Sequence, residues 1–432
     1  MRKTILKTII ARILTWEAHL IIKKYKPKII AVTGSVGKTG TKDMIFHVLS
    51  GHVYVHKSLK SYNSEIGVPL TILMGETGWN DPILWIKNIF RGLTLIFLKN
   101  HYPGYLVLEA GVDRPGDMRN LTSFIKPHIV VFTKLNEIPP HVEFFKGKEN
   151  LYKEKFLLAG AAKKGGTLII NKDDPEIVRL SEPYSAGREV ISFGFSEGAD
   201  VRASDEHIRY KNGIPEGVSF KINAYGNVIP VFVPGTLGEG YIYAALSALS
   251  VAKALDINLV EAASSIASFT PPPGRMRILK GINGSVIIDD SYNASPDAML
   301  SSIHAFKKLR NSGRKILVLG DMLELGGETL GAHQKIGEEF GEEISSIYLV
   351  GPRARFMAEG KKKGGTRQNQ IHPIGGSVEA GDILSKKLKE GDTVLIKGSQ
   401  GIRLEKVIEK ILANQDEKEV LLVRQEAEWK NR

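Results

Sequence analysis

The chain has 432 residues, 42% of them apolar and 25% charged, which is typical of a globular protein with more than one core and excludes a disordered chain. Cysteine is absent, so disulfides, thiolate zinc sites, iron–sulfur clusters and cysteine nucleophiles are excluded. The 59 lysines and arginines exceed the 47 aspartates and glutamates, and the net charge of +12 favours anionic partners such as nucleotides, acidic substrates or anionic lipids.

Residues 1–28 and 79–102 are predicted to contain basic amphipathic helices. In the first segment apolar residues recur at helical spacing, and the second combines tryptophan and phenylalanine with lysine and arginine. Such helices can lie in a membrane interface, and the alternative is that they pack on the body of the protein or on each other. Because charges interrupt the apolar runs, we expect neither a spanning helix nor a signal peptide. The expected location is the cytoplasm, at the inner membrane surface if the first interpretation holds.

Short apolar runs predict strands buried on both faces, and helical patterns lie between them. This alternation indicates an α/β fold with mostly parallel sheets. We expect a central domain over 29–273 with a P-loop-type sheet and a β-hairpin elaboration at 199–234, then a Rossmann-like domain over 274–432. The segment Pro271-Pro272-Pro273-Gly274 marks the boundary, because proline does not continue a helix or a central strand. The charged tail from 415 is expected to fray.

A phosphate-binding loop follows the apolar run at 29–32. Its residues are Thr33-Gly34-Ser35-Val36-Gly37-Lys38-Thr39. The backbone N–H groups of such a turn and the start of the next helix face an anion, while the lysine reaches phosphates and the threonine hydroxyl binds Mg²⁺. The two glycines are separated by two residues, whereas the usual loop has four between them. ATP binding is the prediction, and a tight turn without a nucleotide is the alternative.

Polar residues end several other predicted strands, where ligands bind in open parallel sheets. They are Glu109, Asp289-Asp290-Ser291-Tyr292-Asn293, Asp321, Lys397 and Ser399. Glu109 is a candidate Mg²⁺ ligand, with a helix cap or salt bridge as the alternative. His141 is a candidate for metal or phosphate, although a lone histidine in a loop is more often structural. Arg275, just after the linker, is a candidate for nucleotide phosphate.

Together these segments resemble the Mur ligases, which form amide bonds with ATP in the synthesis of peptidoglycan precursors. The resemblance rests on matches that occur in order along the chain, each of which would be weak alone. They are 33–39, 62–71, Glu109 with 115–118, 141–143, Lys155, 273–276, 289–299, 318–326 and 397–399. The segments 289–299 and 318–326 favour the branch that adds D-alanyl-D-alanine over folyl-polyglutamate or cyanophycin ligases.

The resemblance implies a role for each matched residue. Lys38, His141 and Lys155 would be catalytic, with Lys38 on the phosphates of ATP. Thr39 and Glu109 would hold one Mg²⁺ ion. His141 would hold a second Mg²⁺ ion together with a carbamate on Lys155. No local property of its predicted helix singles out Lys155, and its role comes from the resemblance alone. The nucleotide contacts would come from Gly34, Ser35, Gly37, Lys38, Thr39, Arg275, Asp290, Tyr292 and Asn293, and the substrate contacts from Asn63, Asp321, Leu323, Glu324, Lys397 and Ser399.

The implied reaction is ADP-forming amide synthesis. A carboxylate of a cell-wall peptide precursor takes the γ-phosphate of ATP, and an amine, either one amino acid or a dipeptide such as D-alanyl-D-alanine, then displaces phosphate from the acyl phosphate. The alternatives are the same chemistry on a lipid-linked or non-murein acceptor and a non-catalytic nucleotide-dependent scaffold on the membrane. No basic–aromatic motif indicates a nucleic-acid partner, and a monomer is expected.

Three features depart from the family pattern. Family members carry a UDP-binding domain ahead of the phosphate loop, whereas 32 residues precede Thr33 here, so UDP recognition by that route is not expected. The segment 75–102 has the character of an insertion. Residues 240–246 replace the helix start that contacts adenine in the family. The first two departures lead to the hypothesis that the substrate is held at the membrane on a lipid carrier.

Overall fold

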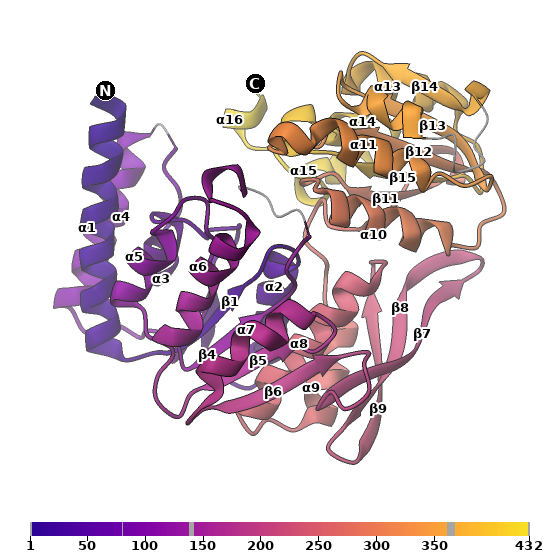
Figure 1. The fold of residues 1–432 in the computed structure, drawn as a ribbon. Helices are drawn as coiled ribbons and strands as arrows, with labels where there is room; N and C mark the ends of the chain where they lie inside the picture. Colours follow the sequence, from indigo (N-terminus) through magenta and orange to yellow (C-terminus); the bar gives the residue numbers. More distant parts are fainter. Residues whose placement is uncertain (1, 80, 138–141, 361–367, 431–432) are drawn as a thin grey trace. The chain divides into compact units, whose positions relative to one another are not determined.

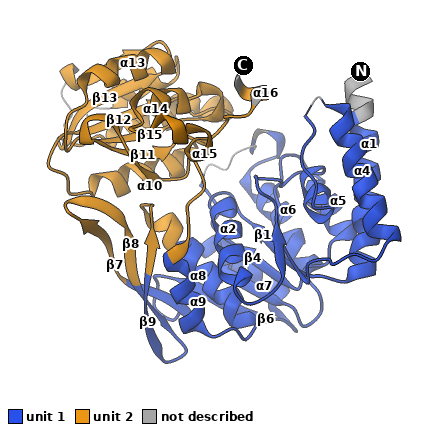
Figure 2. Ribbon diagram, turned by 180° about the vertical axis from the view of Figure 1, so that it is seen from behind, with its two compact units in different colours: residues 1–204, 221–231, 243–267 blue, residues 205–220, 232–242, 268–432 orange. Residues whose placement is uncertain are grey.

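The structure is a computed structural model that describes residues 2–79, 81–137, 142–360 and 368–430 (Figure 1). The chain divides into two compact units (Figure 2). The first comprises residues 1–204, 221–231 and 243–267, and the second comprises 205–220, 232–242 and 268–432. The division passes through three long strands of the predicted hairpin elaboration, so that both units contain separate pieces of the chain.

Among the described residues, one sheet has the strand order β2-β3-β1-β4-β5-β6-β7-β8-β9. Its strands β1 to β6 pair in parallel and lie in the first unit: β1 (Lys28–Thr33), β2 (Val55–Lys57), β3 (Tyr105–Glu109), β4 (Ile129–Phe132), β5 (Thr167–Asn171) and β6 (Glu189–Gly194). Val32 in β1 lies opposite Glu109 in β3, so the carboxyl ends of these strands meet at one edge. The apolar runs are buried on both faces, as the absence of alternation predicted.

The three remaining strands form the predicted hairpins, joined by two-residue turns. They are β7 (Val201–Lys211), β8 (Ile214–Ala224) and β9 (Asn227–Pro234). Asn212 and Gly213 have φ values of 51° and 78°, and Tyr225 and Gly226 have 50° and 81°. Positive φ at both central residues is the conformation whose twist matches that of the flanking strands. The two turns therefore centre on Asn212-Gly213 and on Tyr225-Gly226.

Helices cover the parallel strands of the first unit. They are α1 (Arg2–Tyr25), α2 (Lys38–Ser50), α3 (Gly67–Ile72), α4 (Pro82–Phe97), α5 (Asp117–Phe124), α6 (Lys148–Ala161), α7 (Pro175–Ser185) and α9 (Leu259–Ser265), with α8 (Glu239–Ala254) crossing the division. Leu14 of α1, Leu106 of β3 and Phe156 of α6 share one buried cluster, in which Phe132 and Phe156 stack 4.3 Å apart. The N-terminal helix is thus part of the first core.

The second unit contains a six-stranded sheet of order β10-β11-β15-β12-β13-β14. Only the β10–β11 pair is antiparallel among the described strands, which are β10 (Arg277–Lys280), β11 (Val286–Asp290), β12 (Lys315–Gly320), β13 (Ile344–Val350), β14 (Ile371–Ile374) and β15 (Thr393–Lys397). Adjacent residues of one strand enter two different cores: Leu317 faces one cluster and Val318 the other. Both faces are covered, as in a doubly wound α/β sheet.

Helices of the second unit follow its strands: α10 (Pro296–Lys307), α11 (Thr329–Glu338), α12 (Met357–Gly360), α13 (Ser377–Lys387), α14 (Glu405–Ile411), α15 (Lys418–Leu421) and α16 (Ala427–Lys430). The last two correct the expectation of a frayed tail. Leu422 and Arg424 are buried, and Arg424 Nη1 lies 2.9 Å from the buried Glu405 carboxylate. The segment is held in place by Leu422, which packs in a core cluster, and by the ion pair of Arg424.

No helix within the described part of the chain has the length and apolar character needed to cross a bilayer.

Candidate active site

The predicted phosphate loop is a tight turn between β1 and α2. β1 ends at Thr33 and α2 begins at Lys38. Gly34 has a φ of 145°, and a Cβ there would lie 2.1 Å from Thr133 Oγ1, while Gly37 has a φ of 84°. Both positions are strained for any L side chain, so this shortened loop depends on its two glycines.

Side chains around the loop hold its carbonyl groups. Lys38 Nζ donates to Gly34 O at 3.0 Å and to Ser35 O at 3.1 Å, and Thr133 Oγ1 donates to Val36 O at 2.6 Å. The Ser35 hydroxyl is buried and has no hydrogen-bond partner among the described residues. An unpartnered buried hydroxyl in a glycine-rich turn at the start of α2 fits an incoming phosphate.

Glu109 lies at the end of β3, where three donors meet its carboxylate. Thr39 Oγ1 donates to Oε2 at 3.0 Å, whereas Ser61 Oγ and Asn63 Nδ2 donate to Oε1 at 2.7 and 3.1 Å. The carboxylate is buried. The parallel pairing of β1 with β3 brings residues 70 positions apart into contact and joins three predicted site residues, Thr39, Asn63 and Glu109.

The oxygen atoms at this point fit a magnesium ion. A carboxylate and hydroxyls are hard ligands, and Mg²⁺ in phosphoryl-transfer sites typically takes one or two carboxylates and completes its shell with water and substrate phosphates. The described residues contain no cluster of three or more histidines, aspartates or glutamates that would enclose a metal by themselves. The donor set therefore matches a metal shared with a nucleotide.

Lys155 projects from α6 to the same loop. Its Nζ donates to Gly34 O at 3.1 Å, the carbonyl that also accepts from Lys38. Burial lowers the pKa of Lys155 to about 7, and the nearby charge of Lys38 acts in the same direction. Much of this amine is neutral near neutral pH, which makes it a nucleophile. His141 lies outside the described residues.

Two residues near the site were missed by the sequence reasoning. Lys42 is fully buried in α2, and its Nζ donates to Ser58 O at 3.0 Å, Ser58 Oγ at 3.2 Å and Lys60 O at 2.9 Å. It thereby holds the segment that leads to Ser61, whose hydroxyl contacts Glu109. The position of Ser61, two residues before Asn63, was the available signal. Lys42 had no such signal, because the sequence of its helix does not show that this lysine is buried.

In the second unit, the two aspartates at the end of β11 already have hydrogen-bond and ion-pair partners within the fold. Asp289 accepts from Ser291 Oγ at 2.6 Å and from Gly274 N at 3.0 Å, and burial raises its pKa to about 6. Asp290 Oδ2 lies 2.5 Å from Lys397 Nζ, opposite it in the β11–β15 pair. Lys397 also donates to Asn293 O at 3.1 Å. Asp290 and Lys397 neutralise each other and shape the turn that carries Tyr292 and Asn293.

Two arginine guanidinium groups lie near the ring of Tyr292. Arg275 lies 3.9 Å and Arg424 5.7 Å from the centre of its ring. Arg424 Nη1 also donates to Ser291 O at 3.3 Å. An aromatic face with arginines beside it is suited to a nucleotide, whose base stacks and whose phosphates pair with guanidinium.

The remaining predicted substrate residues lie together beyond β12 and β15. Ser399 Oγ accepts from Leu323 N at 2.9 Å, and Ser399 N donates to Asp321 O at 2.9 Å. The buried Asp321 carboxylate accepts from Arg353 N and Ala354 N at 3.0 and 2.7 Å. Glu324 follows with a φ of 63°. Asp321 thus orders this loop through its side chain, while Leu323 and Glu324 lie in the loop itself.

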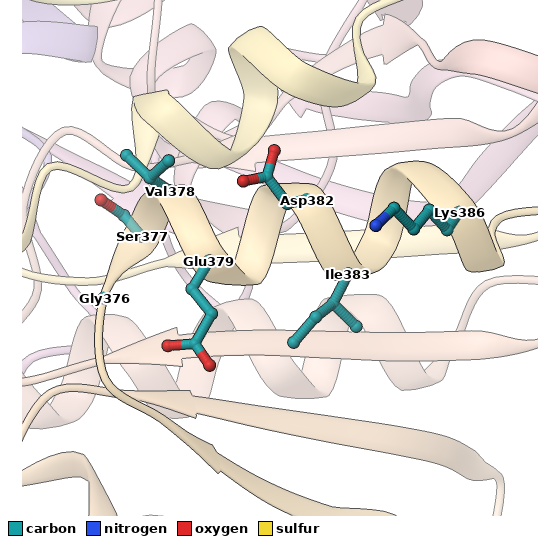
Figure 3. Close-up of a pocket in the computed structure, with 7 residues that line it drawn as sticks. All are labelled: Gly376, Ser377, Val378, Glu379, Asp382, Ile383 and Lys386. Atoms are coloured by element: carbon teal, nitrogen blue, oxygen red, sulfur yellow. The ribbon is translucent and has the colours of Figure 1, made fainter.

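A separate surface hollow runs along α13 (Figure 3). Its lining residues are Gly376, Ser377, Val378, Glu379, Asp382, Ile383 and Lys386. Asp382 pairs with Lys410 at 2.9 Å, and Glu379 accepts from Gly375 N at 3.2 Å. No predicted site residue lines the hollow, and its carboxylates are already engaged.

Two domain models of one family match successive parts of the chain. The Mur ligase middle domain matches residues 32–81 and 91–252, and the Mur ligase glutamate ligase domain matches residues 274–400. The chain belongs to the Mur ligase family. The α/β architecture and the ligase class expected from the motifs are thereby confirmed.

Individual relatives agree with this assignment. The UDP-N-acetylmuramoyl-tripeptide–D-alanyl-D-alanine ligase of Bacillus subtilis strain 168 is 29% identical over 400 residues, covering 91% of this chain and 78% of its own. The enzyme of the same name from Mycobacterium tuberculosis H37Rv is 27% identical, covering 89% and 73%. The MurF ligase of Thermotoga maritima, solved with ADP, is 26% identical with a TM-score of 0.76 and covers 95% of this chain and 84% of that one.

Proposed function

We propose that this protein is an ATP-dependent, ADP-forming ligase that joins a carboxylate of a peptidoglycan-precursor peptide to D-alanyl-D-alanine. The observation that carries the proposal is the contact between Thr39 and Glu109 beside the Lys38 loop, within a chain of the Mur ligase family. The names of the relatives supply the substrates, and the ADP-bound structural neighbour supports the use of ATP.

Thr39, Ser61 and Glu109 are the residues that would hold Mg²⁺ against the phosphates of ATP. When bound, the ion neutralises charge that develops during phosphoryl transfer. Lys38 is placed to leave the loop carbonyls and bind the γ-phosphate, and Ser35 donates its free hydroxyl. The substrate carboxylate attacks the γ-phosphorus, the bond to the β-phosphate oxygen breaks and ADP leaves. The amine then attacks the acyl carbon, loses a proton and displaces phosphate.

Lys155 is proposed to carry a carbamate. Its neutral amine attacks carbon dioxide, a nitrogen–carbon bond forms as one carbon–oxygen π bond opens, and one proton is released, so that the neutral amine becomes a carbamate anion. In that form it no longer opposes Lys38, whose charge lowers the pKa of the free amine. With His141 it would supply ligands for a second Mg²⁺ ion.

In the second unit, Arg275, Tyr292 and Asn293 are proposed to contact the nucleotide, on a turn that Asp290 and Lys397 shape. Asp321, Leu323, Glu324 and Ser399 are proposed to line the site of the incoming amine, and Asn63 in the first unit the acyl substrate. Because the reaction consumes ATP, which is available in the cytoplasm, we propose that the protein is cytoplasmic. We further propose that it is a monomer that works at the inner membrane surface.

The test is phosphate release from ATP with Mg²⁺ and bicarbonate. The UDP-muramoyl-tripeptide and D-alanyl-D-alanine are supplied together and singly, and the product is identified by mass. The proposal expects release only with both substrates and a condensed product. If the protein binds ATP but does not join these two substrates, the UDP-linked peptide is not its acceptor, and the same assay is repeated with a lipid-linked peptide. Absence of ATP binding would contradict the enzyme itself.

A further inference from the structure

Helix α4 exposes large apolar side chains on the face opposite the one that packs on the core. Its buried residues are Asn88, Gly92 and Leu95, and its partly buried Trp85, Ile89 and Ile96 pack against the core of the first unit. On the opposite face large apolar side chains are exposed at positions 3, 4 and 7 apart, namely Ile83 (75% exposed), Ile86 (54%), Phe90 (66%) and Phe97 (75%). An ordinary surface helix is polar on its outward face, and a contiguous exposed apolar stripe there marks a binding surface.

Helix α1 packs beside α4 and adds to the exposed apolar area (Figure 1). Ile9 and Trp16, seven residues apart on one face of α1, are 49% and 53% exposed. The C-terminal ends of the helices lie together, because Lys24 Nζ donates to Leu95 O at 2.8 Å and Tyr25 OH donates to the same carbonyl at 2.8 Å. The helix pair is therefore an ordered part of the first unit, and its outward face is held in place.

The exposed charges of the two helices are all positive. Arg12 and Lys23 lie on the exposed side of α1, and Lys87 and Arg91 flank the apolar stripe of α4. The described α1 side chains include one carboxylate, Glu17, which is fully buried, and α4 has no acidic residue. Lys7 of α1 lies 3.8 Å from Glu65, with both side chains exposed. An apolar stripe beside basic residues is complementary to a layer of anionic lipid headgroups over acyl chains.

Most of the helix pair lies outside the part of the chain that matches the family. The middle-domain match begins at residue 32 and is interrupted over 82–90, so all of α1 and the first half of α4 are excluded from it. We propose that the outward face of α4, with Ile9 and Trp16 of α1, binds the surface of anionic phospholipid bilayers. This inference names the surface by which the proposed ligase would reach the membrane. It rests on the proposed function only for its biological purpose, because the contacts that carry it lie in α1 and α4.

Co-sedimentation of the whole purified protein with vesicles tests the proposal without ATP or substrates, so failure here leaves the ligase proposal standing. Vesicles of phosphatidylcholine alone are compared with vesicles that also contain phosphatidylglycerol. We expect binding to the anionic vesicles and a decrease as salt rises. The Phe90→Ser/Phe97→Ser variant is expected to lose at least about tenfold in partitioning, and Lys87→Ala/Arg91→Ala about tenfold.

A matched control replaces exposed apolar residues elsewhere, Val260→Ser/Val420→Ser, and should bind as the natural chain does. Thermal melting confirms that each variant is folded. Failure of the natural chain to bind either vesicle would overturn the proposal, as would unchanged binding of the phenylalanine variant. A dimer in light scattering that the phenylalanine variant abolishes, without vesicle binding, would instead assign this face to a second copy of the chain.

Discussion

At the scale of single residues, the site depends on two buried ionisable groups, one basic and one acidic. The Lys155 amine lies against the phosphate loop, and the Glu109 carboxylate is buried under three donors. Neither property is local in sequence, because each arises from what the fold places around the side chain. The consequences can be measured one residue at a time.

For Lys155, we predict activity that depends on bicarbonate and on a neutral amine. With a pKa of about 7, the amine is protonated at pH 6 and free at pH 8, so carbamate formation should rise between these values. Lys155→Arg keeps the charge permanently and should lower kcat by a factor of about 100 or more without unfolding the chain. Labelled bicarbonate should give an NMR signal in the natural protein and none in the variant. Lys153→Arg, two residues away on an exposed position, is the control.

Glu17 provides a prediction about stability. Its buried carboxyl, facing Gly92, has a pKa raised to about 7 by burial, and its oxygens have no partner among the described residues. Below about pH 4.5 the carboxyl is protonated in folded and unfolded chains alike. Between about 4.5 and 7 only the unfolded chain loses the proton, so the free energy of unfolding falls as pH rises, by about 3 kcal/mol in all.

Glu17→Gln should therefore raise the melting temperature at pH 8 and change it much less at pH 5. Denaturation of the variant and the natural chain across this pH range measures the difference. Glu182→Gln, at an exposed position, is the control and should show no such trend. An equal effect of Glu17→Gln at both pH values would contradict the assignment.

At the scale of elements, the segment between β2 and α3 is held by one buried cation. Lys42 of α2 binds Ser58 and Lys60, and this fixes the approach of Ser61 and Asn63 to Glu109. Lys42 touches none of the reacting groups and is a positioning residue. Its effect should therefore be seen in metal affinity before chemistry.

Lys42→Met should raise the Mg²⁺ concentration needed for half-maximal ATP binding by roughly tenfold, as loss of outer-shell support does in other metal sites. The measurement is a Mg²⁺ titration of nucleotide binding, with melting temperature recorded in parallel. Lys60→Met keeps the backbone carbonyl that accepts from Lys42 and serves as the control. A lower melting temperature with an unchanged Mg²⁺ dependence would show that Lys42 is structural only.

At the scale of the whole molecule, residues distant in sequence complete each unit. In the second unit the C-terminal segment returns to β11, where Arg424 pairs with Glu405 and donates to Ser291 O. The charged composition of this segment predicted fraying, but Leu422 is buried in a core cluster and Arg424 pairs with a buried carboxylate, and both contacts oppose the loss of chain entropy on ordering.

Arg424→Met should destabilise the protein by about 3 kcal/mol, because it leaves the buried Glu405 with one cationic partner, Arg403, where it had two. It should also weaken ADP binding, since the turn that carries Tyr292 loses a donor. Urea unfolding and calorimetric titration measure the two effects. Arg310→Met, an exposed arginine of the same unit, should leave both unchanged. Unchanged ADP affinity in a destabilised Arg424 variant would limit the residue to stability.

The phosphate loop, the parallel sheets and the hairpins were predictable because their signals are short-range. Gly34 and Gly37 are needed where φ is positive, and apolar runs without alternation indicate strands covered on both faces. The exposed apolar stripe of α4 was not predictable. Its sequence contains apolar residues on most sides, and only the packing of Gly92 against Glu17 shows which side is buried.

The sequence by itself determined the fold class, the family and the identity of the candidate site residues, because these follow from motifs and periodicities that are contiguous in the chain. Tertiary structure decided which of those residues meet. Parallel pairing of β1 and β3 brought Thr39 to Glu109, α6 carried Lys155 to Gly34, and β11 beside β15 joined Asp290 to Lys397. Contacts and burial of this kind depend on chain segments far apart in sequence, and the shifts in the pKa values of Lys155 and Glu17 depend on them in turn.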